Sequence, residues 1–166
     1  TLFTSFNPGS GKTFLTMNTA ATFALKGKRV LVIDGDLRHG SASAYLGSHY
    51  KGLSDYLGKR EAGLDNLIQE NPDCPGFFLL PAGTIPPNPT ELLAEPLFKE
   101  TIERLRDNYD YIFIDCPPID IVADTQIIEK LADRTIFVVR AGLLERDMLP
   151  ELQRMYDEKR FKNMAL

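Results

Sequence analysis

Residues 6–13, Phe-Asn-Pro-Gly-Ser-Gly-Lys-Thr, have the composition and setting of a phosphate-binding loop. A short run at residues 1–5 reads as the end of a strand, and residues 14–26 read as the helix that follows the loop. Glycines let successive backbone N–H groups turn toward phosphate oxygens, and the helix N-terminus adds the positive end of its dipole. The segment therefore predicts phosphate binding, with Lys12 on the β- and γ-phosphates and the Thr13 hydroxyl on Mg²⁺.

The loop departs from the pattern G-x-x-x-x-G-K-[ST] at one position, because Phe6 stands where the first glycine is expected. It is not the dinucleotide fingerprint G-x-G-x-x-G either, since Phe14 occupies the position of the last glycine. We expect a continuous set of residues to contact the nucleotide: Pro8, Gly9, Ser10, Gly11, Lys12, Thr13 and Phe14.

Strand-like and helix-like segments alternate along the rest of the chain. Continuous apolar runs predict strands at residues 29–34, 77–81, 109–115 and 135–140. Helical patterns occupy residues 14–26, 96–108, 123–132 and 147–159. Such alternation is typical of βαβ units, so we expect an α/β fold of the P-loop NTPase type, with a mostly parallel central sheet and helices on both faces.

Two shorter patterns make local predictions. Residues 88–91, Asn-Pro-Thr-Glu, predict a helix start with Asn88 as the cap and Glu91 completing a capping box. The last predicted helix carries an apolar stripe that indicates core packing, made of Met148, Leu149, Leu152, Met155 and Tyr156.

The composition limits the remaining possibilities. A chain of 166 residues with 43% hydrophobic residues predicts one domain with a real core. The net charge of −4 argues against nucleic acid as a partner, and no apolar run is long enough to span a bilayer. Residues 2–5 are short for a central strand, and residues 161–166 read as a strand that is just beginning. We therefore expect residues 1–166 to be a single domain truncated at both ends.

Three acidic residues lie at the predicted ends of strands. Asp34 closes one strand, Asp36 follows two residues later, and Asp115 closes another. Ligands of open α/β sheets bind at the carboxyl ends of the strands, and an aspartate at such an end typically reaches Mg²⁺ through water. Two such strand ends beside a phosphate loop indicate phosphoryl transfer. We also predict that the strands leading to Phe6 and Asp115 are neighbours, because Thr13 and Asp115 would share one Mg²⁺.

Four segments resemble the bacterial tyrosine kinases of capsule and exopolysaccharide synthesis. They are residues 5–13 (SFNPGSGKT), 33–38 (IDGDLR), 83–93 (GTIPPNPTELL) and 114–118 (IDCPP). The resemblance covers nearly the whole chain. It implies an ATP- and Mg²⁺-dependent protein-tyrosine kinase on a P-loop scaffold, and the eukaryotic kinase signatures H-R-D-L-x-x-x-N and D-F-G do not occur in this sequence.

The resemblance also implies roles for individual residues. Lys12 would bind phosphate, and Thr13, Asp36 and Asp115 would organise Mg²⁺ around ATP or the product ADP. Asp36 would in addition orient or deprotonate the incoming tyrosine hydroxyl, with Asp34 in support.

The partners implied by the resemblance are a transmembrane activator, fused or separate, and neighbouring subunits in a homo-oligomeric ring at the cytoplasmic face of the inner membrane. The family's phosphorylated tyrosines lie in a C-terminal tail of the neighbouring subunit, and no tyrosine-rich tail follows Leu166 in this sequence. Ser41 stands where a tyrosine is often found in one branch of the family, so we do not expect that residue to control access to the site.

Two other functions stay open at this point. The partition and septum-positioning ATPases share the scaffold but carry a lysine where this chain has Asn7, and residues 86–89 (PPNP) favour the kinase. The third possibility is a nucleotide-binding scaffold without turnover, against which Lys12, Asp36 and Asp115 argue.

Overall fold

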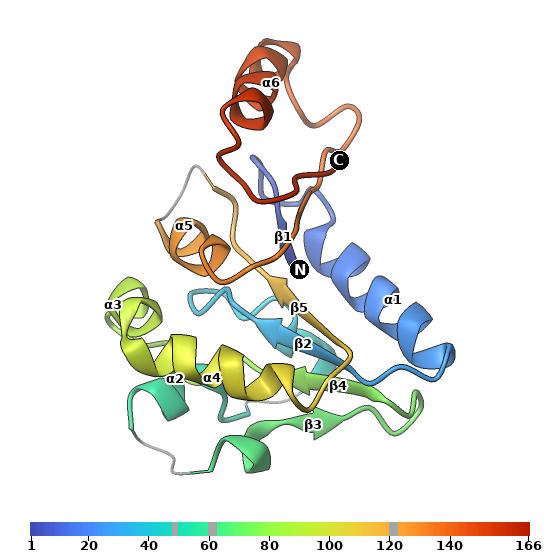
Figure 1. Ribbon diagram of the computed structural model, residues 1–166, viewed down its shortest axis with the longest axis vertical. Helices are drawn as coiled ribbons and strands as arrows, with labels where there is room; N and C mark the ends of the chain where they lie inside the picture. Colours follow the sequence, from blue (N-terminus) through green and yellow to red (C-terminus); the bar gives the residue numbers. More distant parts are fainter. Residues whose placement is uncertain (48–49, 60–62, 120–122) are drawn as a thin grey trace.

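The computed structural model describes residues 1–47, 50–59, 63–119 and 123–166. Within these residues the strands form one sheet with the order β3-β4-β2-β5-β1-β6. Figure 1 labels β1 to β5 of this sheet. The strands are β1 (Leu2–Thr4), β2 (Val30–Asp34), β3 (Gln69–Glu70), β4 (Phe77–Leu80), β5 (Tyr111–Asp115) and β6 (Thr135–Phe137). All neighbouring strands pair in parallel except β3, which runs antiparallel to β4. The predicted mostly parallel α/β sheet is confirmed.

Helices cover both faces of this sheet (Figure 1). The long helix α1 (Lys12–Leu25) lies on one face. The other face carries α2 (Leu53–Leu57), α3 (Pro89–Ala94), α4 (Pro96–Arg106) and α5 (Asp124–Glu129). The last helix, α6 (Leu149–Asp157), follows β6 and stands at one end of the molecule.

Strand β2 shows how the two layers hold the sheet. Its side chains alternate, so that Leu31 and Ile33 pack in one apolar cluster with Phe98 of α4. Val30 and Val32 belong to a second cluster that includes the inward face of α1. These four β2 residues are fully buried, which explains the continuous apolar run in the sequence and fixes the carboxyl end of the strand.

Strand β5 lies between β1 and β2. In the register of the sheet, Phe3 of β1 and Asp34 of β2 both stand opposite Asp115 of β5. The predicted pairing of the strands that lead to Phe6 and Asp115 is therefore confirmed. The carboxyl ends of the three strands meet at one edge of the sheet.

The predicted strands and helices differ from the observed ones by up to three residues at an end, and two of these differences have a clear cause. Helix α1 begins at Lys12 rather than at residue 14, because Gly11 is left-handed (φ 92°) and the helix starts directly after it. Strand β6 ends at Phe137 rather than at residue 140. Its partner β1 ends at Thr4, whose carbonyl accepts the Val138 N–H at 2.7 Å, and β1 offers no further residue for pairing beyond that bond.

Residues 35–76 contain elements that no sequence pattern predicted. They are α2, β3 and the short 3₁₀ segments Ser43–Leu46 and Leu64–Leu67. Each is at most five residues long, which is too short for a clear hydrophobic period. Strand β3 is the polar dipeptide Gln69–Glu70 at the sheet edge, so it lacks the apolar signature of a strand.

The predicted helix start at residues 88–91 is confirmed, but the predicted capping box is wrong. Helix α3 begins at Pro89. The Asn88 side chain donates from Nδ2 to Oε2 of Glu91 at 2.7 Å, and within the described residues it caps no backbone N–H group. The two side chains satisfy each other instead of the helix end.

The C-terminal region differs from prediction in its packing. A 3₁₀ turn (Arg146–Met148) precedes α6, which ends at Asp157. Within the predicted apolar stripe, Leu152 and Met155 are buried, whereas Leu149 and Tyr156 are 49% and 59% exposed. The predicted strand at residues 161–166 is present only as a parallel bridge between Ala165 and Ile136 of β6.

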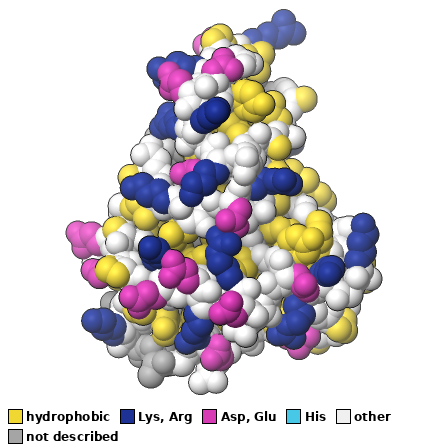
Figure 2. Space-filling model, in the orientation of Figure 1, with side chains coloured by type: hydrophobic (Ala, Val, Ile, Leu, Met, Phe, Trp, Pro, Cys, Tyr) yellow, Lys and Arg dark blue, Asp and Glu magenta, His cyan; other side chains and the backbone are white. Residues whose placement is uncertain are grey.

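The surface carries both signs of charge. Lys and Arg side chains lie interspersed with Asp and Glu on the face seen in Figure 2. None of the described helices combines the length and apolar character needed to cross a membrane.

Candidate active site

The loop between β1 and α1 is shaped by two left-handed glycines. Gly9 and Gly11 have φ of 72° and 92°, a conformation that costs other residues energy. Side-chain hydrogen bonds tighten the turn, because the hydroxyls of Ser5 and Ser10 both donate to the Asn7 carbonyl, at 2.8 and 2.7 Å. The result is a compact loop directly before the N-terminus of α1, as phosphate binding requires.

Phe6 explains the departure from the phosphate-loop pattern. Its side chain is 3% exposed and packs edge-on against Phe137 of β6, with ring centroids 4.9 Å apart. Phe6, at the first position of this loop, is therefore part of the apolar cluster between β6 and α6.

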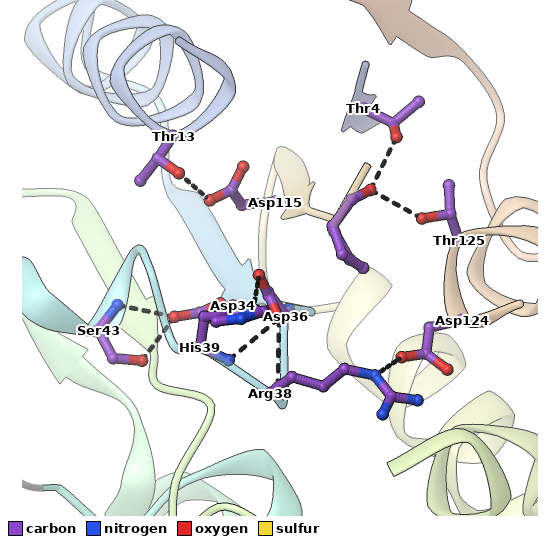
Figure 3. Close-up of polar contacts among 11 residues, drawn as sticks. Thr4, Thr13, Asp34, Asp36, Arg38, His39, Ser43, Asp115, Asp124 and Thr125 are labelled. Carbon is purple, nitrogen blue, oxygen red and sulfur yellow. Dashed lines mark hydrogen bonds and ion pairs between the residues drawn. The ribbon is translucent and has the colours of Figure 1, made fainter. Parts of the chain in front are cut away.

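Lys12 and Thr13 occupy the first turn of α1, at the carboxyl edge of the sheet. The Thr13 hydroxyl donates to Oδ2 of Asp115 at 2.6 Å (Figure 3). Burial lowers the pKa of Lys12, and the charges of Asp115 and Asp36 oppose that shift. The charges of both carboxylates therefore act on the Lys12 ammonium group.

Asp115 is almost completely buried, at 1% exposure. Burial raises its pKa to about 6, although the hydrogen bond from Thr13 and the charge of Lys12 lower it. Its second oxygen, Oδ1, has no hydrogen-bond partner among the described residues. A buried carboxylate oxygen without a partner, beside a threonine hydroxyl, fits a hard divalent cation such as Mg²⁺ or its bound water.

Asp36 lies in the turn that follows β2. Its Oδ1 accepts the backbone N–H groups of Arg38 and His39 at 3.2 and 3.1 Å, and His39 Nδ1 lies 3.2 Å from each carboxylate oxygen. The residue is 6% exposed. In the described part of the chain no three acidic, histidine or cysteine side chains gather closely enough to hold a metal ion by themselves. A cation here would therefore also need water or phosphate oxygens, as Mg²⁺ does in nucleotide sites.

Asp34 is placed differently from the other two acids. It is fully buried, and its Oδ2 accepts the backbone N–H and the hydroxyl of Ser43 at 2.7 and 2.6 Å. Its Oδ1 accepts the Asp36 N–H at 3.2 Å. Burial raises the pKa of Asp34 to about 7, and the bonds from Ser43 oppose the shift. The carboxylate of Asp34 thus holds the chain around Asp36.

The remaining predicted contact residues line the loop and the start of α1. Pro8 is exposed, Ser10 is 7% exposed, and Phe14 is 61% exposed in the first turns of α1. Cys116 directly follows Asp115, but burial raises the pKa of its thiol well above the ordinary value, so it stays protonated.

The sequence reasoning did not assign several residues that join this region. Arg140, just beyond β6, donates from Nη1 to the Gly9 carbonyl at 3.0 Å and so contacts the phosphate loop. Arg38, the last residue of the segment IDGDLR, donates hydrogen bonds to Thr90 and Asp124. The only signal in the sequence for these contacts is position, because Arg38 follows the predicted strand 29–34 and Arg140 is the last residue of the predicted strand 135–140.

A family model described as an AAA domain matches residues 3–158. The putative tyrosine-protein kinase AmsA of Erwinia amylovora is 40% identical over 161 residues, which is 96% of this chain and 21% of that protein. The tyrosine-protein kinase CpsD of Streptococcus pneumoniae is 40% identical over 84% of this chain and 61% of its own length. CpsD of Streptococcus agalactiae serotype III is 33% identical over 98% of this chain and 70% of its length.

This chain therefore spans about a fifth of the Erwinia protein and about three fifths of the pneumococcal one. Among solved structures, the kinase domain of the Escherichia coli tyrosine kinase ETK matches 98% of this chain and 63% of its own, with a TM-score of 0.88 and 32% identity. The septum site-determining protein MinD from Pyrococcus horikoshii, complexed with Mg-ADP, matches 98% of this chain and 66% of its own, with a TM-score of 0.76 and 25% identity. The chain belongs to this AAA domain family of nucleotide-binding P-loop folds and, within it, to the bacterial tyrosine kinases.

Proposed function

We propose that this chain is the catalytic unit of an ATP-dependent protein-tyrosine kinase that regulates capsular or exopolysaccharide synthesis and export. The observation that carries the proposal is the meeting of Lys12, Thr13, Asp36 and Asp115 at one edge of the sheet, in a chain related to bacterial tyrosine kinases. Phosphoryl transfer needs this combination of a cation, a metal site and a second carboxylate.

In the proposed reaction Lys12 stabilises the charge that develops on the transferring phosphoryl group. Its depressed pKa follows mainly from burial, and a buried cation acts more strongly on a phosphate than an exposed one. Thr13 and Asp115 would hold Mg²⁺ together with Asp36, and bound Mg²⁺ supplies charge neutralisation at the phosphates. ATP would lie along residues 8–14, with its phosphates over the N-terminus of α1.

Asp36 would also orient the acceptor tyrosine and accept its hydroxyl proton. Among the three strand-end acids it suits this role because it is the least buried, at 6% exposure against 1% for Asp115 and 0% for Asp34. Asp34 would act in support, by fixing the backbone of Asp36 through the bond to its N–H group.

The partners we propose are a transmembrane activator, fused or separate, and further copies of the chain in a ring whose tyrosine-rich tails are the acceptors. This assembly would work at the cytoplasmic face of the membrane. The proposal rests on membership of the tyrosine-kinase family.

A MinD-like ATPase switch is the second candidate, favoured by the TM-score of 0.76 to MinD. Asn7 opposes it, because the lysine that those ATPases carry at this position is missing from the loop.

Mass spectrometry of a tyrosine-rich peptide after incubation with this protein and Mg-ATP separates the two. A kinase leaves phosphate on peptide tyrosine, whereas an ATPase switch releases inorganic phosphate and leaves the peptide unmodified.

A further inference from the structure

Arg38, Thr90 and Asp124 form a closed triangle of hydrogen bonds beside the candidate site. Arg38 Nε donates to Asp124 Oδ2 at 3.1 Å (Figure 3), and Arg38 Nη2 donates to the Thr90 hydroxyl oxygen at 3.0 Å. The Thr90 hydroxyl in turn donates to Asp124 Oδ1 at 2.5 Å. Three segments far apart in the sequence are joined here: the turn after β2, the start of α3 and the start of α5.

The burial of Asp124 makes this contact strong. The Asp124 side chain is 1% exposed, whereas that of Arg38 is 34% exposed. A buried carboxylate needs a hydrogen-bonding cation or donor on each oxygen. Asp124 meets this need, because Arg38 donates to its Oδ2 and the Thr90 hydroxyl donates to its Oδ1. The side chain of Arg38 is therefore held in one place from the interior of the protein.

Arg38 also belongs to the turn that holds Asp36. Its backbone N–H donates to Asp36 Oδ1 at 3.2 Å, and the next residue, His39, donates to the same oxygen at 3.1 Å. Asp124 thus reaches the carboxylate of Asp36 through a single residue. The side chain of Leu37, which is 1% exposed, also anchors this turn.

The Asp124 corner of the triangle is held close to the segment that follows Asp115. Thr125, the neighbour of Asp124, donates its hydroxyl to the Pro117 carbonyl at 3.0 Å, and Thr4 of β1 donates to the same carbonyl at 3.0 Å (Figure 3). The triangle therefore connects the segment that directly follows Asp115, the last residue of β5, with the turn after β2 that carries Asp36.

We propose that Asp124 and Thr90 are positioning residues for Asp36. They hold the Arg38 side chain and thereby fix the turn whose N–H groups aim the Asp36 carboxylate at the site. The proposal rests on the proposed function in one respect, namely that Asp36 is the acid that serves the reaction.

The first test measures the turn directly, without any reaction. In the nucleotide-free protein, Asp124→Asn keeps the size of the side chain but removes the charge that holds Arg38. We expect the amides of Arg38 and His39 to exchange hydrogen about tenfold faster or more, with amides in α1 and β2 unchanged within about twofold. Thr90→Val should also speed hydrogen exchange at these two amides, but less than Asp124→Asn does. Thr90→Ser, which keeps the hydroxyl, should leave their exchange at the wild-type rate.

The second test uses transfer of phosphate to a tyrosine-rich peptide. Asp124→Asn should lower kcat about tenfold or more while changing the Kd for Mg-ADP by less than about threefold. The double variant Arg38→Gln/Asp124→Asn should lose no more than the worse single variant, because both changes break the same contact.

The control is Asp133→Asn, which removes an Arg–Asp pair with Arg106 before the start of β6, away from the carboxyl edge. It should leave exchange at Arg38 and His39 and the value of kcat unchanged.

Unchanged exchange at Arg38 and His39 in folded Asp124→Asn and Thr90→Val would overturn the proposal. Equal losses in kcat and in affinity for Mg-ADP in Asp124→Asn would also overturn the proposal. A wild-type protein that transfers no phosphate would refute the proposed function instead, and the exchange experiment would still decide the positioning role.

Discussion

The Thr13 hydroxyl lies 2.6 Å from Oδ2 of Asp115, although 102 residues separate the two in the sequence. The pairing of β1 with β5 brings them together, since Thr13 follows the loop after β1 and Asp115 ends β5. The other oxygen of Asp115 stays without a hydrogen-bond partner in the described part of the chain. This pair is the structural basis for proposing a Mg-nucleotide site.

Replacement of Lys12 by methionine should abolish phosphate transfer, with a loss of at least about 100-fold, because the charge on the transferring group loses its cation. The fold should persist, since Lys12 lies at the first turn of α1 and not in the core. A peptide phosphorylation assay measures the loss, and a calorimetric scan checks the fold. Lys26→Met, at the exposed other end of α1, is the matched control and should keep wild-type activity. Wild-type rates in Lys12→Met would refute the role.

Asp36→Asn should lose more turnover than nucleotide affinity. The amide keeps the size and one acceptor oxygen for the N–H groups of Arg38 and His39 but lacks the charge. Oriented proton transfer is typically worth about 10²–10⁴ in rate, so kcat should fall within that range. Steady-state kinetics and titration with a fluorescent ADP analogue measure the two quantities. Parallel losses in both would make Asp36 a binding residue only.

Phe6→Ala should destabilise the protein by about 3–5 kcal/mol, because it removes a buried ring from the cluster with Phe137. Urea unfolding measures the change. Phe14→Ala, at a position that is 61% exposed, is the control and should change the free energy of unfolding by about 0.5 kcal/mol or less. A destabilisation by Phe6→Ala as small as that of Phe14→Ala would contradict the packing role.

The raised pKa of Asp34 predicts a pH dependence of stability. Burial raises this pKa from its ordinary value of 3.8 to about 7, so the folded state binds a proton that the unfolded state has already released. The stability that this proton contributes is therefore fully present when the pH is below the pKa of Asp34 in the unfolded chain. It is lost as the pH rises through the pKa of Asp34 in the folded protein. In nucleotide-free protein with EDTA, the stability of wild type relative to Asp34→Asn should fall between about pH 4 and about pH 7. Urea titrations at several pH values measure it, and parallel curves for the two proteins would contradict the assignment.

The sequence was sufficient for those parts of the fold that have a strong local pattern. The apolar run that became β2 is fully buried, and those that became β4 and β5 are buried except at Phe78, Tyr111 and Ile112. The ends of β2 and β5 carry Asp34 and Asp115. The loop before α1 was identified from glycines whose left-handed geometry the structure shows at Gly9 and Gly11.

Other features depend on tertiary contacts that leave no local pattern. Strand β3 exists because β4 offers it an edge, not because of its own residues, Gln69 and Glu70. The bond of Asp34 to Ser43 was not predicted, because nothing in the sequence distinguishes a buried aspartate at a strand end from one that faces the ligand. The contact of Arg38 with Asp124 joins residues 86 positions apart and depends on the packing of α5.

The most direct measurement of the central claim is the search for phosphotyrosine by mass spectrometry after wild-type protein and Lys12→Met are each incubated with Mg-ATP and a tyrosine-rich peptide. Assignment of the protein as a tyrosine kinase predicts phosphate on the tyrosines of the peptide with wild type, and none with Lys12→Met or when EDTA removes the metal ion. An unmodified peptide in the presence of folded wild-type protein that binds and hydrolyses ATP would contradict it.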